Sequence, residues 1–293
     1  MVSISSDLSS HAASAQLGGV SNADNVLSLI DALPDELMLK VYEYLEVPDL
    51  GKCQMVSRRW KLLAGDVSFE KKIQLHRIHE MLPDEGNFID ERAWKLLGDI
   101  GEVPPLPDNI FEELMKPCPF WNPKGTADGK KVKDTHVLGV MVDKVNNEPV
   151  TINSIEKYAK TPKEGGHATQ YDGIWEPIRE DFGETAVEKP YWALMTEDML
   201  PGSQFQFRND QLAMAANFGY EAPTLLQAIA YNIVRYVSTG KGIFNKDPWR
   251  CTCCQEQTGG MKSVVGGFSS SGLFVYRASN RSRNVGVAAL RKF

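Results

Sequence analysis

Residues 31–70 constrain the fold of this 293-residue chain most strongly, because three short helix patterns follow one another there with few loop residues between them. Asp31 can cap the first helix and Pro34 suits its opening turn, while Pro48 and the residue after it break and recap the chain. Apolar residues recur at helical spacing in each pattern. They are Leu37, Val41, Tyr44 and Leu45, then Leu50, Cys53, Val56 and Trp60, then Trp60, Leu63, Ala64 and Val67.

The size of this segment raises a physical problem. About 40 residues lie at the limit of independent folding without a disulfide, a metal or a partner. The segment nevertheless carries apolar residues on more than one helix face, so part of its apolar surface needs another surface to cover it. From the pattern alone, that surface can belong to residues 71–293 or to another protein.

The same stretch resembles the F-box, in order and in spacing. The matching residues are Leu33-Pro34, Leu37, Tyr44-Leu45, Asp49-Leu50, Cys53, Val56-Ser57-Arg58-Arg59-Trp60 and Leu62-Leu63-Ala64. Phe69 stands where many F-boxes carry Trp, which keeps an aromatic residue at that position.

The resemblance implies a partner and a set of contact residues. F-boxes dock on the small Skp adaptor protein of SCF-type (Skp–cullin–F-box) ubiquitin ligases, so Skp and, through it, cullin are the expected partners. By position, the residues implied to make or support this contact are Leu33, Pro34, Leu37, Leu45, Leu50, Cys53, Val56 and Trp60.

Composition and charge narrow the remaining classes of partner and compartment. A net charge of −6 argues against nucleic acid, and no run approaches the roughly 18 apolar residues of a membrane span. Five cysteines, three of them within residues 251–254, make a poor disulfide framework and favour a reducing compartment. No Lys or Arg precedes Lys40, so the basic start of a secretory signal peptide is not found. We therefore expect a cytoplasmic protein, with the nucleus also open.

The segments on either side of the F-box pattern differ in character. Residues 1–30 contain eight serines and few large apolar groups, which predicts disorder. Residues 71–118 are predicted to form a helical connector, in which Asp90 caps one helix and 104–107 interrupts the chain with prolines.

Residues 119–293 predict an α+β domain with a mainly antiparallel sheet, so the fold class of the whole chain is α+β. The expected strands are 137–142, 191–195, 263–265, 273–276 and 285–290, and the expected helices are 154–160, 207–218 and 224–237. Thr224 is expected to cap the last helix and Gly240 to end it, with Ile229, Ile233 and Val237 along its buried face. No internal repeat is found, unlike in F-box proteins that end in leucine-rich, kelch or WD repeats.

This region shows a second resemblance. The order of Cys118-Pro119-Phe120-Trp121, 191–196, 200–203 and the closing 286–293 is similar to the C-terminal region of F-box-like proteins from chlamydia-related bacteria that live inside amoebae. It implies a bacterial effector delivered into the cytosol of a eukaryotic host, and it implies no particular activity.

Several residue clusters invite a chemical interpretation. Cys251, Cys253 and Cys254 lack the two-pair spacing of zinc sites, and a fourth ligand would have to be Cys118 or a distant histidine such as His136. A thiol nucleophile needs a histidine base, for which His136 and His167 are available outside any recognisable motif. His76 and His79 sit three apart on a helix, where an exposed polar face is the common explanation. We therefore predict no metal, no cofactor and no catalytic residue.

The distribution of charge is more informative. Residues 257–293 contain six basic and no acidic residues, so they carry +6 while residues 1–256 carry −12. Arg277, Arg281 and Arg283 flank or lie in a loop between two predicted strands. They are candidates for a surface that binds an acidic substrate protein, the alternative being a solvated hairpin tip.

Three hypotheses follow for function. In the first, the F-box holds the ligase and residues 119–293 hold a substrate for ubiquitination. In the second, residues 119–293 are an enzyme tethered to the ligase. In the third, the chain binds the Skp adaptor and only sequesters it. The absence of a catalytic motif favours the first hypothesis over the second, and the sequence does not separate the first from the third.

Overall fold

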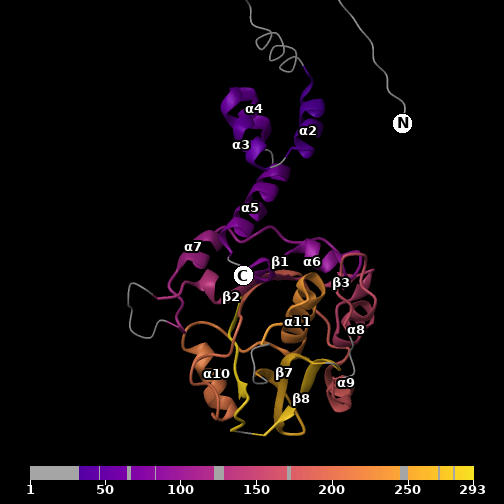
Figure 1. Cartoon of the computed structure of the whole chain (residues 1–293), viewed down its shortest axis with the longest axis vertical. Helices are drawn as coiled ribbons and strands as arrows, with labels where there is room; N and C mark the ends of the chain where they lie inside the picture. Colours follow the sequence, from indigo (N-terminus) through magenta and orange to yellow (C-terminus); the bar gives the residue numbers. More distant parts are fainter. Residues whose placement is uncertain are drawn as a thin grey trace, which may run out of the picture. The chain divides into compact units, whose positions relative to one another are not determined.

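The computed structural model describes residues 33–45, 47–64, 67–82, 84–121, 129–169, 173–244, 250–269, 271–279 and 281–293. The chain divides into two compact units, residues 1–70 and residues 71–293, and the division falls inside helix α5 (Val67–Met81) (Figure 1). Asp31 and residues 1–30, for which we predicted a helix cap and disorder, lie outside the described residues.

The described part of the first unit contains helices α2 (Asp35–Glu43), α3 (Val47–Val56) and α4 (Arg58–Ala64), followed by the start of α5. These three helices match the three predicted patterns in part, because Trp60 of the second pattern lies on α4 and Val67 of the third begins α5. Pro48 is the second residue of α3, where its missing N–H costs no helical hydrogen bond. The residue before α2 is Pro34, whose extended backbone begins the helix without a side-chain cap.

The second unit mixes helices and strands. Its helices are α6 (Glu91–Lys95), α7 (Ile110–Met115), α8 (Ile152–Lys160), α9 (Glu176–Phe182), α10 (Arg208–Ala216) and α11 (Leu225–Thr239). Its strands are β1 (Phe88–Ile89), β2 (His136–Met141), β3 (Lys144–Val145), β4 (Glu148–Pro149), β5 (Tyr191–Thr196), β6 (Cys251–Thr258), β7 (Met261–Ser269), β8 (Gly272–Ala278), β9 (Val285–Gly286) and β10 (Leu290–Lys292).

The strands form two four-stranded sheets and a small hairpin. One sheet has the order β1-β2-β5-β10, the other has the order β8-β7-β6-β9, and β3 pairs with β4. Within the described residues, five of the seven strand pairings are antiparallel; β1 with β2 and β6 with β9 are parallel. The α+β class is therefore observed, with a parallel pair at an edge of each larger sheet.

Helix α11 lies at the centre of the second unit and contacts strands of both larger sheets (Figure 1). Thr224 caps it as predicted by accepting a hydrogen bond from the Gln227 N–H, and Gly240 ends it with a left-handed φ of 71°. The predicted face of Ile229, Ile233 and Val237 is buried, but so are most other residues of the helix. The helix is enclosed on nearly all sides because sheets pack against more than one of its faces.

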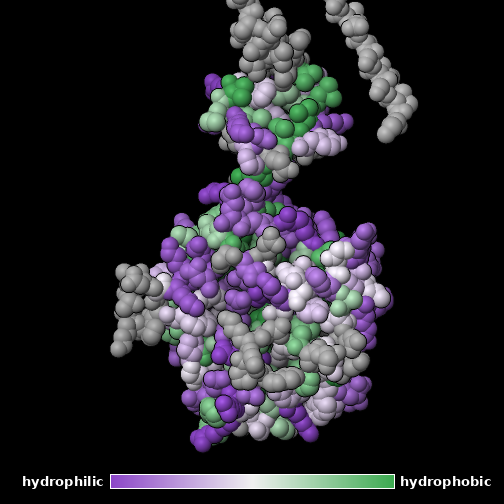
Figure 2. Space-filling view, viewed as in Figure 1, coloured by the Kyte–Doolittle hydropathy of each residue, from purple (hydrophilic) through white to green (hydrophobic). Residues whose placement is uncertain are grey.

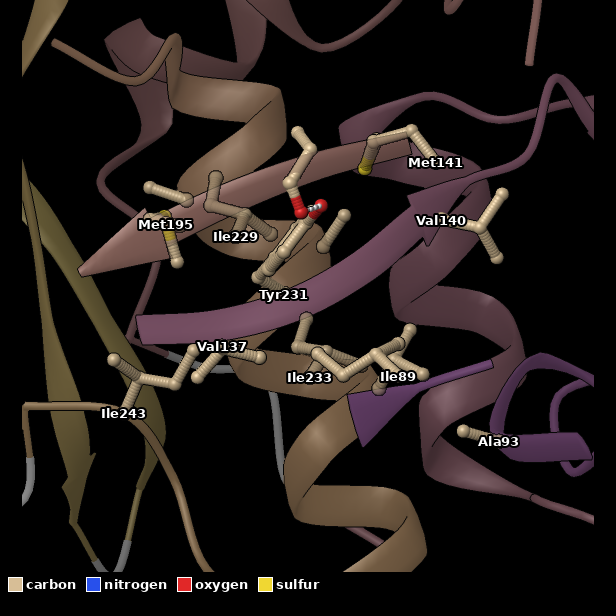
Figure 3. Close-up of a cluster of buried hydrophobic side chains, with 14 of the residues drawn as sticks. Ile89, Ala93, Val137, Val140, Met141, Met195, Ile229, Tyr231, Ile233 and Ile243 are labelled. Carbon is tan, nitrogen blue, oxygen red and sulfur yellow. Dashed lines mark hydrogen bonds between the residues drawn. The ribbon is translucent and has the colours of Figure 1, made fainter. Parts of the chain in front are cut away.

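The hydroxyl of Tyr231 ties α11 to the first sheet. It donates hydrogen bonds to the carbonyls of Gly139 on β2 (2.7 Å) and Ala193 on β5 (3.2 Å). Figure 3 shows this side chain within a cluster that includes Ile229 and Ile233 of the same helix. Glycine is required at position 139, because a Cβ there would lie 2.7 Å from the Tyr231 ring.

Residues 71–118 are built into the second unit, which differs from the separate helical connector that we expected. Strand β1 pairs with β2, with Phe88 opposite Leu138. The Trp94 side chain on α6 is fully buried, and its indole N–H donates to the Val140 carbonyl at 2.7 Å. Asp90 caps α6 as predicted, by accepting from the backbone N–H groups of two residues in its first turn. The segment therefore supplies core residues as well as a connection.

The predicted strand 285–290 is also different in the structure, where it is divided between the two sheets. Strand β9 pairs with β6, whereas β10 pairs with β5. Between them, the backbone N–H groups of three buried residues donate to side chains: Val287 to Ser203 Oγ (3.1 Å), Ala288 to Thr252 Oγ1 (2.8 Å) and Ala289 to Thr196 Oγ1 (3.0 Å). Three hydroxyls thus replace the strand-to-strand hydrogen bonds where the chain crosses between sheets.

Candidate adaptor-binding face and basic surface

The first unit has a small core of its own. Its buried apolar residues are Met38, Tyr42, Cys53 and Trp60, with Leu33, Leu39, Leu45 and Leu63 partly buried against them. The rings of Tyr42 and Trp60 meet edge to face, with their centroids 6.2 Å apart. Burial raises the pKa of the Cys53 thiol, which suits a packing role better than a reactive one.

The motif at residues 56–60 has a clear structural basis. Ser57 caps α4, because its hydroxyl accepts from the backbone N–H of Trp60 at 3.1 Å. The Arg59 guanidinium donates to the Asp35 carboxylate at 2.9 Å through Nε and also to the Leu33 carbonyl. Arg59 therefore ties α4 to the start of α2, while Trp60 fills the core between them.

Among the described side chains of this unit, six large apolar ones remain exposed, by 47% (Leu37) to 87% (Tyr44) of their surface. Leu37, Val41 and Tyr44 follow one another at helical spacing along α2, on a face that differs from that of buried Met38 and Tyr42. Met55 and Val56 lie at the end of α3, and Leu62 lies on α4. Figure 2 shows apolar side chains on the surface of this unit. We call Leu37 and Val41 of α2, together with the C-cap residue Tyr44, the outer α2 face.

The structure divides the implied adaptor-binding residues into three groups. Pro34, Leu37 and Val56 are exposed and available for contact, Leu33 and Leu45 are partly buried, and Cys53 and Trp60 are core residues that support the helices. The side chain of Leu50 is not among the described ones. The implied set omitted Val41, Tyr44, Met55 and Leu62, which are as exposed as Leu37 or more so. The helical spacing of Leu37, Val41 and Tyr44 was the signal that could have added two of them.

The cysteines of residues 251–254 lie on β6, which alternates their side chains between two faces. Cys251 and Cys253 pack in one apolar cluster with Val264, whereas Cys254 packs in the main core. Burial raises the pKa of all three thiols, that of Cys253 to about 11. These surroundings are the opposite of those that activate a thiolate.

The other candidate ligands are Cys118, His136 and His79. Cys118 is buried in a cluster with Phe120 and Tyr220, and burial lowers the pKa of His136 to about 3, so its imidazole is neutral. His136 Nδ1 lies 2.8 Å from the Thr135 hydroxyl. His79 lies 3.5 Å from Asp90. Among the described residues, no three His, Cys, Asp or Glu side chains gather closely enough to hold a metal ion.

A cavity of about 400 Å³ lies beside the start of α11. Several of the polar side chains that line it are paired with protein groups. Glu256 accepts from the Leu225 N–H at 2.8 Å, Gln227 donates to the Tyr191 hydroxyl at 2.6 Å, and the Lys292 ammonium lies 3.0 Å from a Glu221 carboxylate.

The six basic residues of 257–293 have different surroundings. Lys262 is buried and bonds the Gln206 carbonyl and the Gln211 side chain, while Arg291 pairs with Glu113 and Lys292 with Glu221. Arg277, Arg281 and Arg283 are exposed, and among the described residues none of them lies within salt-bridge distance of a carboxylate. Among the described residues, the three predicted surface arginines are thus the ones of these six without an acidic partner at salt-bridge distance, apart from buried Lys262.

The structure separates Arg277 from the other two. Lys262 pairs with Ala278 and Ser263 pairs with Arg277, so Arg277 leaves the sheet on the face opposite Lys262. Its guanidinium stacks on the ring of Trp175, 4.2 Å from the centroid. Arg281 instead stacks on Phe207, 4.4 Å from the centroid. Arg281 and Arg283 therefore belong to one surface and Arg277 to another.

Comparisons with known proteins support the interpretation of the first unit. Residues 30–75 match the family model described as F-box-like, so the chain carries an F-box-like domain there. The chain is also similar to human F-box/WD repeat-containing protein 8, with 35% identity over 65 residues, which are 22% of this chain and 10% of that protein. No solved structure matches the chain.

A separate finding concerns membranes. None of the helices in the described part of the chain has both the length and the apolar character needed to cross a bilayer.

Proposed function

We propose that this protein is a non-catalytic substrate adaptor of an SCF-type ubiquitin ligase. The observation that carries the proposal is the outer α2 face, an exposed apolar stripe on a unit that matches the F-box-like family. Each apolar residue of this kind stabilises a complex by up to about 1.5–3 kcal/mol when a partner buries it fully. The proposed partner is the Skp adaptor protein, which links the chain to cullin.

In this proposal, the second unit holds a target protein so that ubiquitin transfer takes place elsewhere in the ligase. Its buried cysteines, whose thiol pKa values are raised, and its neutral His136 support a binding role rather than a catalytic one. We propose no cofactor, and neither nucleic acid nor membrane as a partner.

We further propose that the chain acts in the cytosol of a eukaryotic host as a bacterial effector. The support is the resemblance of 118–293 to F-box-like proteins of chlamydia-related bacteria. An effector of this kind would redirect the ligase of the host to a new target.

The test is affinity capture of Skp and cullin by the tagged full-length protein, followed by immunoblotting for both. Wild type and a Phe218→Glu control, which changes an exposed apolar residue of the second unit, are expected to capture both. Leu37→Glu/Val41→Glu is expected to capture neither. Capture of Skp without cullin would favour sequestration of the adaptor, and equal capture by all three proteins would contradict the proposed docking face.

A further inference from the structure

Two surface loops of the second unit lie side by side and hold each other in place. The backbone N–H of Phe205 donates to the Ser282 carbonyl at 3.3 Å, and the Gln204 side chain donates to the Arg283 carbonyl at 3.1 Å. The Arg281 guanidinium stacks on the Phe207 ring. We call the surface formed by Phe205, Phe207, Arg281 and Arg283 the aromatic–arginine surface.

The composition of this surface is unusual for one exposed only to water. Phe205 and Phe207 are 57% and 47% exposed, and both arginines are exposed. Large aromatic side chains and arginine are the types enriched where proteins bind one another. The two aromatic rings and the two guanidinium groups come from segments about 75 residues apart in the sequence.

The backbone of both loops is strained at this surface. Phe205 has φ of 61° and Arg281 has φ of 60°, which is the left-handed region that favours glycine. Such conformations persist where the surrounding structure imposes them, and they gather at binding and catalytic sites. Here the strain accompanies an exposed aromatic ring on one loop and an exposed guanidinium on the other.

We propose that the aromatic–arginine surface binds an acidic protein segment that also carries an aromatic side chain. Stacking on Phe207 fixes the plane of the Arg281 guanidinium and leaves its N–H groups free to hold a carboxylate through two bonds. Phe205 offers an apolar contact beside it. Residues 1–256 carry a net charge of −12, so a short acidic segment suits this local basic site better than a broad anionic bilayer does. This inference rests on the proposed function, in which such a segment belongs to the target protein.

The test is fluorescence anisotropy of a labelled random copolymer of Glu and Tyr, titrated with the purified full-length protein. Reversal of two charges, Arg281→Glu/Arg283→Glu, is expected to weaken binding at least about tenfold and to remove its decrease with added salt. Arg277→Glu reverses an exposed arginine on β8, outside the aromatic–arginine surface, so binding should change by less than about twofold. A copolymer of Lys and Tyr should not bind wild type.

A second variant separates binding from folding. Phe205→Gly removes the aromatic ring and suits the positive φ, so its thermal midpoint should equal or exceed that of wild type while binding falls about fivefold or more. The proposal would be overturned if Arg281→Glu/Arg283→Glu and Phe205→Gly both bound the copolymer as tightly as wild type does. It would also be overturned if Arg277→Glu weakened binding as much as the double reversal. Binding of phosphatidylserine vesicles, but not of the copolymer, would instead assign the surface to a lipid.

The experiment is independent of the adaptor. Leu37→Glu/Val41→Glu should bind the copolymer as wild type does. If wild-type protein captures Skp but does not bind the copolymer, the proposed role of the aromatic–arginine surface is rejected, while the proposed docking face on α2 is unaffected.

Discussion

The crossing between the two sheets at residues 287–289 provides a quantitative test of the fold. Thr196 is fully buried, and its hydroxyl accepts from the Ala289 N–H at 3.0 Å while it donates to the Asp198 carbonyl at 2.9 Å. Thr196→Val preserves the shape of the side chain but removes the hydroxyl. The Ala289 N–H is then left buried without a partner.

The expected cost follows from that unpaired group. A buried N–H without a partner destabilises a protein by about 1–3 kcal/mol. For a unit of this size each kcal/mol lowers the thermal midpoint by about 2–4 °C, so a loss of about 2 kcal/mol corresponds to about 4–8 °C. Thr196→Ser keeps the hydroxyl and loses one methyl group, so it should cost about 1 kcal/mol or less.

The measurement is chemical and thermal unfolding of the full-length protein, followed by tryptophan fluorescence, which reports the buried Trp94 and Trp192 of the second unit. Thr185→Val, at an exposed position, serves as the matched control and should stay within about 0.5 kcal/mol of wild type. The argument is refuted if Thr196→Val is as stable as wild type, or if Thr196→Ser is the less stable of the two variants.

Three further predictions concern other parts of the chain. Burial lowers the pKa of His136 from its usual 6.5 to about 3, so between these pH values the unfolded chain binds a proton at this residue and the folded chain does not. As pH falls from 6.5 to about 3, the free energy of unfolding therefore decreases by up to about 1.4 kcal/mol per pH unit. His136→Asn should flatten this pH dependence, measured by urea unfolding. The methyl group of Gly139→Ala would lie 2.7 Å from the Tyr231 ring and should lower the free energy of unfolding of the second unit by about 1–3 kcal/mol, measured by the same unfolding assay. An unchanged thermal midpoint would mean that α11 can move to make room for the methyl group. Trp60→Ala should cost the first unit about 3–5 kcal/mol, seen as loss of protease resistance before α5, while the second unit keeps the wild-type midpoint.

The features that were predictable from sequence depend on neighbours in the chain. Thr224 and Gly240 bound α11 and Asp90 caps α6, because capping requires particular residues within one helical turn. Strands β2, β5, β7 and β8 were predicted for a similar reason, since their apolar runs are bounded by turn residues, whereas β6 (Cys251–Thr258), with its polar residues, was not among the expected strands. The F-box-like domain was identified by its resemblance to a known family, and the family match covers the same stretch.

The features that were missed depend on residues distant in sequence. The run 285–290 is apolar throughout and therefore reads as one strand. Nothing local indicates that the backbone N–H groups of Ala288 and Ala289 bond the hydroxyls of Thr252 and Thr196 in place of a neighbouring strand. Strand β1 has only two residues, and it exists because β2 offers an edge.

The candidate binding residues show the same limit. Leu37 and Met38 are adjacent and both apolar, and which of them faces inward is decided by the contact of α2 with Trp60 on another helix. Arg277 and Arg281 lie four residues apart, yet the register of β8 and the turn after it send them to different surfaces. In each case the sequence predicted which segment carries apolar or basic side chains, and only the structure shows which surface each side chain faces.

The choice of variants for the central claim follows from this geometry. Leu33 is partly buried and its carbonyl accepts from Arg59, so a change there disturbs the helices as well as the surface. Leu37 and Val41 are about half exposed on the outer α2 face, so acidic substitutions there alter the contact with little effect on the core.

The most direct measurement is a calorimetric titration of purified Skp adaptor protein into the full-length chain and into Leu37→Glu/Val41→Glu, with unfolding of each followed in parallel. We expect the wild type to bind and the variant, equally stable, to bind at least about a hundredfold more weakly, which corresponds to about 2.8 kcal/mol. Equal affinity of the two proteins for Skp, or no binding by the wild type, would contradict the assignment of the outer α2 face as the ligase-docking surface.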